Sequence, residues 1–134
     1  MKKIMAFILL SYSAAPFALQ IDRNNLYSPA YTKCLDNAKG EHPSVMSCIE
    51  DEKILLRKMS LERLHDDIHD DEQTKLALKI KNMDSMWALF VREKCTVILE
   101  LGGQRGEMLK GDCEVREEIE RLRYIREIFI ESEI

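Results

Sequence analysis

The chain has 134 residues, which is enough for one domain. Its 24 acidic residues outnumber its 20 lysines and arginines, so the formal net charge at pH 7 is −4. A net-negative surface argues against nucleic acid and anionic membranes as partners and favours a basic protein partner.

The N-terminus has the layout of a secretory signal peptide. It combines a basic start, a short apolar core and a run of small residues, at residues 1–3, 4–10 and 11–18. The apolar run is too short for a permanent membrane anchor, and we expect cleavage after Ala18. Loss of Lys2 and Lys3 would change the net charge from −4 to −6. Residues 19–134 are then expected to form one helical domain, either periplasmic or secreted.

Four cysteines in a short exported chain indicate two disulfide bonds. Three pairings are possible, but each local pair brackets a stretch rich in turn-forming residues. One stretch holds a glycine and a proline, and the other holds four glycines. We therefore predict the bridges Cys34–Cys48 and Cys95–Cys113. The alternative, a four-cysteine zinc site, would need close C-x-x-C pairs, which the sequence lacks.

Two helices are expected before residue 70. Ser28-Pro29 is a good helix start, because serine caps and proline suits the first turn, and Gly40 should end this helix. The second helix opens at Pro43-Ser44 and continues to a break near residues 68–72. Its polar residues, including Lys53 and Arg57, are expected to face water.

A long third helix is expected to organise the fold. Acids at residues 70–72 suit its positive N-terminal end, and Gly102 suits its C-cap. Eight residues with steps of three and four, seven of them apolar, predict one buried face: Leu76, Ile80, Met83, Trp87, Phe90, Lys94, Val97 and Leu101. We expect this face to be the centre of the protein and Trp87 to be its core anchor.

A glycine-rich break is expected at residues 102–111, followed by a last helix at about residues 112–130. The apolar face of this helix comprises Val115, Ile119, Leu122, Ile125 and Phe129. The sequence thus predicts an all-α protein, a small antiparallel bundle of three to four helices stapled by two disulfides.

The order of these features resembles the LprI-like family, that is, lysozyme inhibitor LprI N-terminal-type domains, which are small exported bacterial helical proteins. The resemblance covers roughly residues 34–122. It rests on Cys34 and Cys48 around a short turn, Glu52, Trp87 eight residues before Cys95, the Gly102-Gly103 turn, and Cys113 leading into an Arg- and Leu-containing helix. It implies a binding protein that inhibits a basic lysozyme-type hydrolase and has no catalytic residues and no cofactor.

A lysozyme inhibitor has to block a cleft that holds two catalytic carboxylates. The segment at residues 102–106 is glycine-rich and carries Gln104 and Arg105, so we hypothesise that it is a protruding loop and that Arg105 reaches those carboxylates. The alternative is that the segment only connects two helices.

Two other functions stay open. One is an immunity-type or host-directed protein that binds a target other than a lysozyme. The other is a metal-binding periplasmic protein, for which His65 and His69, four residues apart on a helix, are weak candidate ligands. The oligomeric state is left open.

Overall fold

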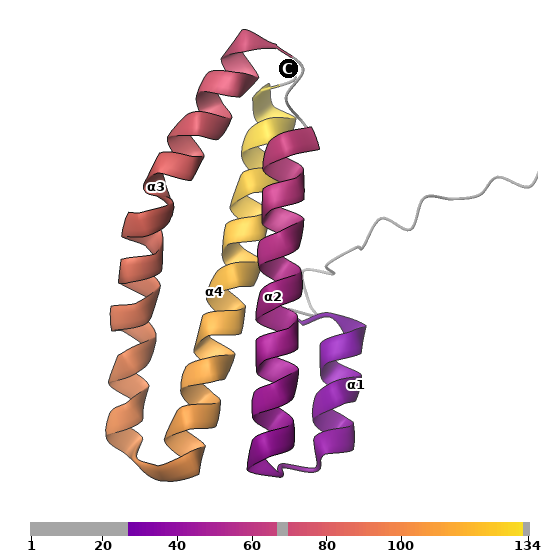
Figure 1. Ribbon diagram of the computed structural model, residues 1–134, viewed down its shortest axis with the longest axis vertical. Helices are drawn as coiled ribbons and strands as arrows, with labels where there is room; N and C mark the ends of the chain where they lie inside the picture. Colours follow the sequence, from indigo (N-terminus) through magenta and orange to yellow (C-terminus); the bar gives the residue numbers. More distant parts are fainter. Residues whose placement is uncertain (1–26, 67–69, 133–134) are drawn as a thin grey trace, which may run out of the picture.

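The computed structural model describes residues 27–66 and 70–132 and is helical throughout this part of the chain (Figure 1). No strand occurs in these ranges. The elements are α1 (Pro29–Ala38), α2 (His42–Asp66), α3 (Asp71–Thr96), the 3₁₀ helix η1 (Val97–Leu101) and α4 (Gly103–Ser132). The predicted all-α bundle is therefore confirmed. The signal peptide predicted at residues 1–18 lies outside the described residues.

Helix α4 is the centre of the bundle. It packs along α2 on one side and α3 on the other, while the short α1 packs on α2 (Figure 1). The apolar face predicted for the last helix is confirmed, because its five residues are all buried: Val115, Ile119, Leu122, Ile125 and Phe129. Because α4 packs against α2 and α3 at the same time, it contributes more buried apolar residues to the core than a helix with one neighbour would.

The prediction that residues 76–101 form the central face is wrong. Met83, Phe90, Val97 and Leu101 are 55%, 58%, 69% and 68% exposed. The residues that α3 buries follow a neighbouring line along the helix: Gln73, Ala77, Ile80, Val91 and Cys95. The disulfide at Cys95 explains the difference. It holds Cys95 against α4, and residues at helical spacing from Cys95 must then share its inward direction.

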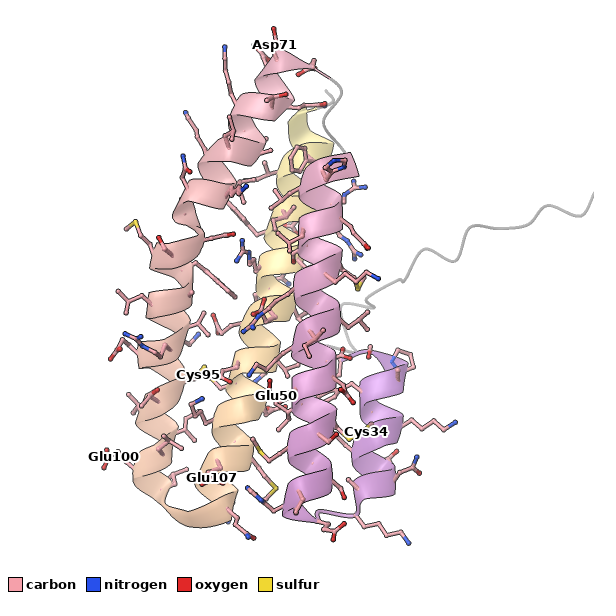
Figure 2. All side chains as sticks on the ribbon, in the orientation of Figure 1. Cys34, Glu50, Asp71, Cys95, Glu100 and Glu107 are labelled. Carbon is pink, nitrogen blue, oxygen red and sulfur yellow. A yellow bond between two sulfur atoms is a disulfide. The ribbon has the colours of Figure 1, made fainter. Side chains whose placement is uncertain are left out.

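Both predicted disulfides are confirmed. Cys34–Cys48 joins α1 to α2, and Cys95–Cys113 joins the end of α3 to α4, with Cα–Cα distances of 5.8 Å and 5.7 Å. Figure 2 shows Cys34 beside α2 and Cys95 between α3 and α4. The bridges thus fix one peripheral helix and one helix that flanks the centre.

The helix ends follow local rules. The Ser28 side chain accepts a hydrogen bond from the backbone N–H of Tyr31 at 3.0 Å, and Pro29 is the first residue of α1. Asp70 caps α3 in the same way through the N–H of Gln73, at 2.8 Å. Gly102 has φ +73°, which favours glycine at the turn after η1. The predicted helix starts near residues 28 and 70 and the turn at Gly102 are confirmed, but α3 ends at Thr96 and the 3₁₀ helix η1 covers the last five residues predicted for it.

The predicted break at residues 102–111 is wrong, because α4 begins at Gly103 and runs through it. Gly111 serves close packing instead of a loop, whereas Gly106 has room for a methyl group. A Cβ at Gly106 would lie 3.4 Å from the carbonyl oxygen of Ile98 in η1, and a Cβ at Gly111 would lie 2.9 Å from Cδ1 and Cγ2 of Ile49 in α2. Gly111 therefore allows α2 and α4 to approach closely.

Within the described residues, none of the helices combines the length and apolar character needed to span a bilayer.

Replacement of Gly111 by alanine should destabilise the protein by about 1–3 kcal/mol, because the new methyl group must displace the buried Ile49 side chain. Gly106→Ala is the matched control. Its methyl group meets only ordinary contacts, so the better helix propensity of alanine should leave stability unchanged or raise it. Urea unfolding of both variants checks this, and equal midpoints would contradict the packing role of Gly111.

Candidate binding groove between α2 and α3

Polar residues of α4 form ion pairs with both neighbouring helices. Towards α2, Lys53 Nζ lies 2.9 Å from Glu114 Oε2, and Arg57 Nε lies 2.7 Å from Glu118 Oε1. Towards α3, Lys94 Nζ lies 2.5 Å from Glu117 Oε1, and Arg121 pairs with Asp84. These pairs add polar contacts between the helices beside the apolar core.

Lys53 was expected to face water, but it is buried between α2 and α4. Burial alone would lower its pKa, but hydrogen bonds to Glu114 and Glu50 outweigh burial and raise the pKa. Glu114 shows the reverse balance: burial would raise its pKa, but hydrogen bonds from Lys110 and Lys53 outweigh burial and lower it. The Lys53–Glu114 pair is therefore held in its charged form.

At Glu118, burial outweighs the hydrogen bond, which is the opposite of the balance at Glu114. Its side chain is 3% exposed, and burial raises its pKa despite the opposing hydrogen bond from Arg57. One carboxylate oxygen, Oε2, has no hydrogen-bond partner in the described structure. Ser60, one turn after Arg57 on α2, is also buried, and its Oγ likewise has no partner there. Two buried polar atoms without partners therefore lie in the same region of the interface between α2 and α4.

Arg121 connects α4 to α3 through Trp87 and Asp84. The centre of its guanidinium group lies 4.6 Å from the centre of a Trp87 ring, within the range of a cation–π contact, and the same group pairs with Asp84. Burial and, after it, the positive charge of Arg57 lower the pKa of Arg121. Trp87 is half-buried and packs on the cluster formed by Val91 and the Cys95–Cys113 bridge.

These residues line a groove between α2 and α3. Its larger part has a volume of about 350 Å³ and is lined by Arg57, Ser60, Leu61, Asp84, Trp87, Ala88, Glu118 and Arg121. A second hollow, of about 280 Å³, shares Leu61 and is also lined by Leu64, His65, Thr74, Ala77, Leu78 and Lys81. We call the two hollows together the interhelical groove. Figure 1 shows α3 and α2 on either side of α4, the arrangement in which these lining residues lie.

A second surface lies on the outer side of α3 and continues onto η1. It comprises Met83, Met86, Phe90, Val97 and Leu101, which are all more than half exposed. We call it the outer face of α3. It contains four of the eight residues expected to form the central face, and Met83 also lines a small hollow with Tyr124 of α4.

Gln104 and Arg105 lie in the first turn of α4 and are exposed, so they are not part of a loop. They follow directly on the corner between η1 and α4, close in sequence to Glu100 and Glu107, which Figure 2 labels there. Their role in target binding stays a prediction, but a protruding loop no longer supports it.

The proposed histidine pair is placed only in part. His65 lies on the last turn of α2, while His69 lies outside the described residues. Across residues 27–66 and 70–132, no three histidine, cysteine, aspartate or glutamate side chains are grouped as metal ligands.

The interhelical groove was not predicted from the sequence. Its charged residues on α4, Glu118 and Arg121, occur beside the apolar line of that helix and are spaced three apart, so they share one side of it. This spacing of three residues beside an apolar row could have predicted a polar row that faces another helix. The partners on α2 and α3 depend on how the helices pack.

The profile of the Antitoxin TsiV3 family matches residues 39–132. The chain belongs to this family. The match includes the whole of α2, α3 and α4, and with them every residue of the interhelical groove. Comparison with curated proteins and with solved structures gave no match.

Membership in an antitoxin family indicates a small immunity-type protein that acts by binding a protein partner. The family match supports an immunity-type protein better than a lysozyme inhibitor. It does not support the resemblance to LprI-like proteins specifically.

Glu114 and Glu118 provide a pH test, because their pKa values move in opposite directions. A carboxyl group whose pKa is lower in the folded protein stabilises the fold at pH values above its unfolded pKa. This stability is lost as the pH falls through the folded pKa. A raised pKa contributes stability below the unfolded pKa, which is lost as pH rises through the folded pKa. Glu114→Gln should therefore lose stability relative to the wild type as pH rises from about 3 to 5, the range around and below the unfolded pKa, and should stay about 1–3 kcal/mol less stable up to pH 7.

Glu118→Gln should become progressively more stable relative to the wild type as pH rises from about 4 to 7, which is the range above the unfolded pKa of this carboxyl. Urea unfolding at four pH values checks both variants. Parallel pH slopes for the two variants would contradict the opposite charge balance of the two sites.

Proposed function

We propose that this protein is an exported immunity protein that neutralises a toxin by binding it, and that the toxin is a lysozyme-type cell-wall hydrolase. The observation that carries the proposal is the match of the Antitoxin TsiV3 family over residues 39–132. Binding, and not catalysis, is the activity that follows from this family.

The scaffold supports a binding function. Disulfides hold α1 against α2 and α3 against α4, and the interhelical groove lies between helices of 25 and 26 residues. A surface that is already ordered loses little conformational entropy when a partner binds, so more of the contact energy contributes to affinity.

The compartment and the target rest on further arguments. A leader-like start and two disulfides are typical of proteins that work outside the cytoplasm. A cell-wall hydrolase acts in that compartment. A basic hydrolase would also be attracted to a chain whose net charge is −4, or −6 after loss of the leader.

The test is a lysis assay with purified, oxidised residues 19–134. The probes are a panel of lysozyme-type hydrolases and the products of the two genes that flank the gene of this protein, because an antitoxin has to be inherited with its toxin. We expect at least a tenfold reduction of peptidoglycan lysis by one probe, weaker inhibition at high salt, and loss of inhibition after reduction of the disulfides.

The controls separate the two parts of the proposal. Binding of a flanking-gene product that does not lyse peptidoglycan would retain the immunity function and reject the hydrolase target. Absence of binding to every probe would reject the proposal. Arg105→Ala, tested in the same assay, shows whether the first turn of α4 contacts the target, as the sequence predicts.

A further inference from the structure

The interhelical groove is open because α2 and α3 both pack on α4 and share no extended contact with each other. Leu61 of α2 and Leu78 of α3, 59% and 54% exposed, line the groove from its two sides. More than half of the surface of each side chain stays exposed in the described fold. These side chains provide contact area for a segment that enters from outside.

The groove presents basic groups although the whole chain is acidic. Its two acids, Asp84 and Glu118, are engaged by Arg121 and Arg57. Glu118 is almost inaccessible, whereas the Arg57 side chain is 60% exposed. Arg57 bonds Glu118 through Nε only, which leaves its two terminal nitrogens for another acceptor. At the Arg121–Asp84 pair the acid is the more exposed partner, with side chains 13% and 34% exposed, so the positive charge offered to an incoming segment is that of Arg57.

Ser60 adds an independent observation. The residue is 3% exposed, lines the larger part of the groove, and its Oγ bonds no atom of the described structure. A helical serine commonly bonds the carbonyl four residues back, but Ser60 does not. A buried hydroxyl without a partner costs about 1–3 kcal/mol, and a bound acceptor would recover part of this cost.

We infer that the interhelical groove is the surface that receives the toxin, and that it binds an apolar segment of the toxin carrying a carboxylate side chain. The apolar part packs between Leu61 and Leu78. The carboxylate accepts hydrogen bonds from the terminal nitrogens of Arg57, whose orientation is set by Glu118, and Ser60 is close enough along α2 to donate a further one. The identity of the partner as a toxin rests on the proposed function, but the chemistry of the groove does not.

This arrangement also constrains how inhibition works. A groove receives a segment that protrudes, whereas the catalytic carboxylates of a lysozyme-type hydrolase lie inside a cleft. The carboxylate bound by Arg57 therefore belongs to the surface of the toxin. Inhibition then follows because the bundle covers the entrance of the cleft.

The first experiment tests the groove without the toxin. Trp87 is the only tryptophan and lines the groove, so its indole N–H signal in the NMR spectrum reports occupancy. The probes are two peptides, acetyl-Leu-Glu-Leu-amide and acetyl-Leu-Lys-Leu-amide. We expect the acidic peptide to shift the Trp87 signal at millimolar concentration and to bind at least fivefold more tightly than the basic one. No shift, or equal affinity, would overturn the inference.

Three variants locate the binding surface. Leu61→Arg places a longer side chain in the groove and blocks the space for the apolar part of the peptide. Arg57→Gln removes the positive charge that binds the carboxylate of the peptide. Met86→Arg is the matched control, because Met86 is a 73% exposed apolar residue on the outer face of α3. We expect Leu61→Arg to abolish the acidic-peptide shift, Arg57→Gln to weaken binding at least threefold, and Met86→Arg to leave it within twofold. Thermal melts confirm that all three fold.

The second experiment repeats the variants with the probe that binds the wild-type protein in the lysis assay. Loss of binding in Leu61→Arg together with normal binding in Met86→Arg supports the inference, and the reverse pattern overturns it. If Leu61→Arg instead converts a dimer into a monomer in light scattering, the occupant is a second copy of this chain and the inference is wrong. If the peptides bind but no protein probe does, the proposed function fails while the groove chemistry stands.

Discussion

The Cys95–Cys113 bridge is the constraint on which the arrangement of α3 depends. A helix can rotate about its axis with little cost to its own hydrogen bonds, so a mixed apolar sequence leaves its inward direction open. The bridge removes this freedom by holding Cys95 against α4. Trp87, two turns earlier, is then brought over the Arg121 guanidinium group. The same rotation turns the outer face of α3 away from the core.

Helix α4 carries two adjacent rows with different tasks. Its apolar row closes the core, while its charged row pairs with α2 and α3. The charged row does not stabilise evenly. Glu114 is held ionised by two lysines, but burial raises the pKa of Glu118, so its ionised form costs stability at neutral pH. A buried acid that costs stability is retained most readily where it positions another group, and here it orients Arg57 at the groove.

The parts of the fold that were predictable from the sequence depend on neighbouring residues along the chain. The Ser28 and Asp70 caps, the local disulfides and the apolar row of α4 all follow from short spacings. The rest depends on packing. The sequence placed Gly111 in a loop because the residue it packs against, Ile49, lies on another helix. It placed Lys53 in water because its ion-pair partner, Glu114, also lies on another helix. The cysteine spacing indicated a helical protein stapled by disulfides, but it did not distinguish between two families of such proteins.

The two disulfides have separable consequences for binding. Cys34–Cys48 attaches α1 to the side of α2, and neither α1 nor this bridge lines the interhelical groove. Cys95–Cys113 determines which residues of α3 face α4, and two of these residues, Asp84 and Trp87, line the groove. The first bridge therefore acts on the groove only through overall stability, whereas the second also sets its shape and charge. A protein that works as a rigid surface needs both, since the groove is prebuilt only while α3 keeps its rotation on α4.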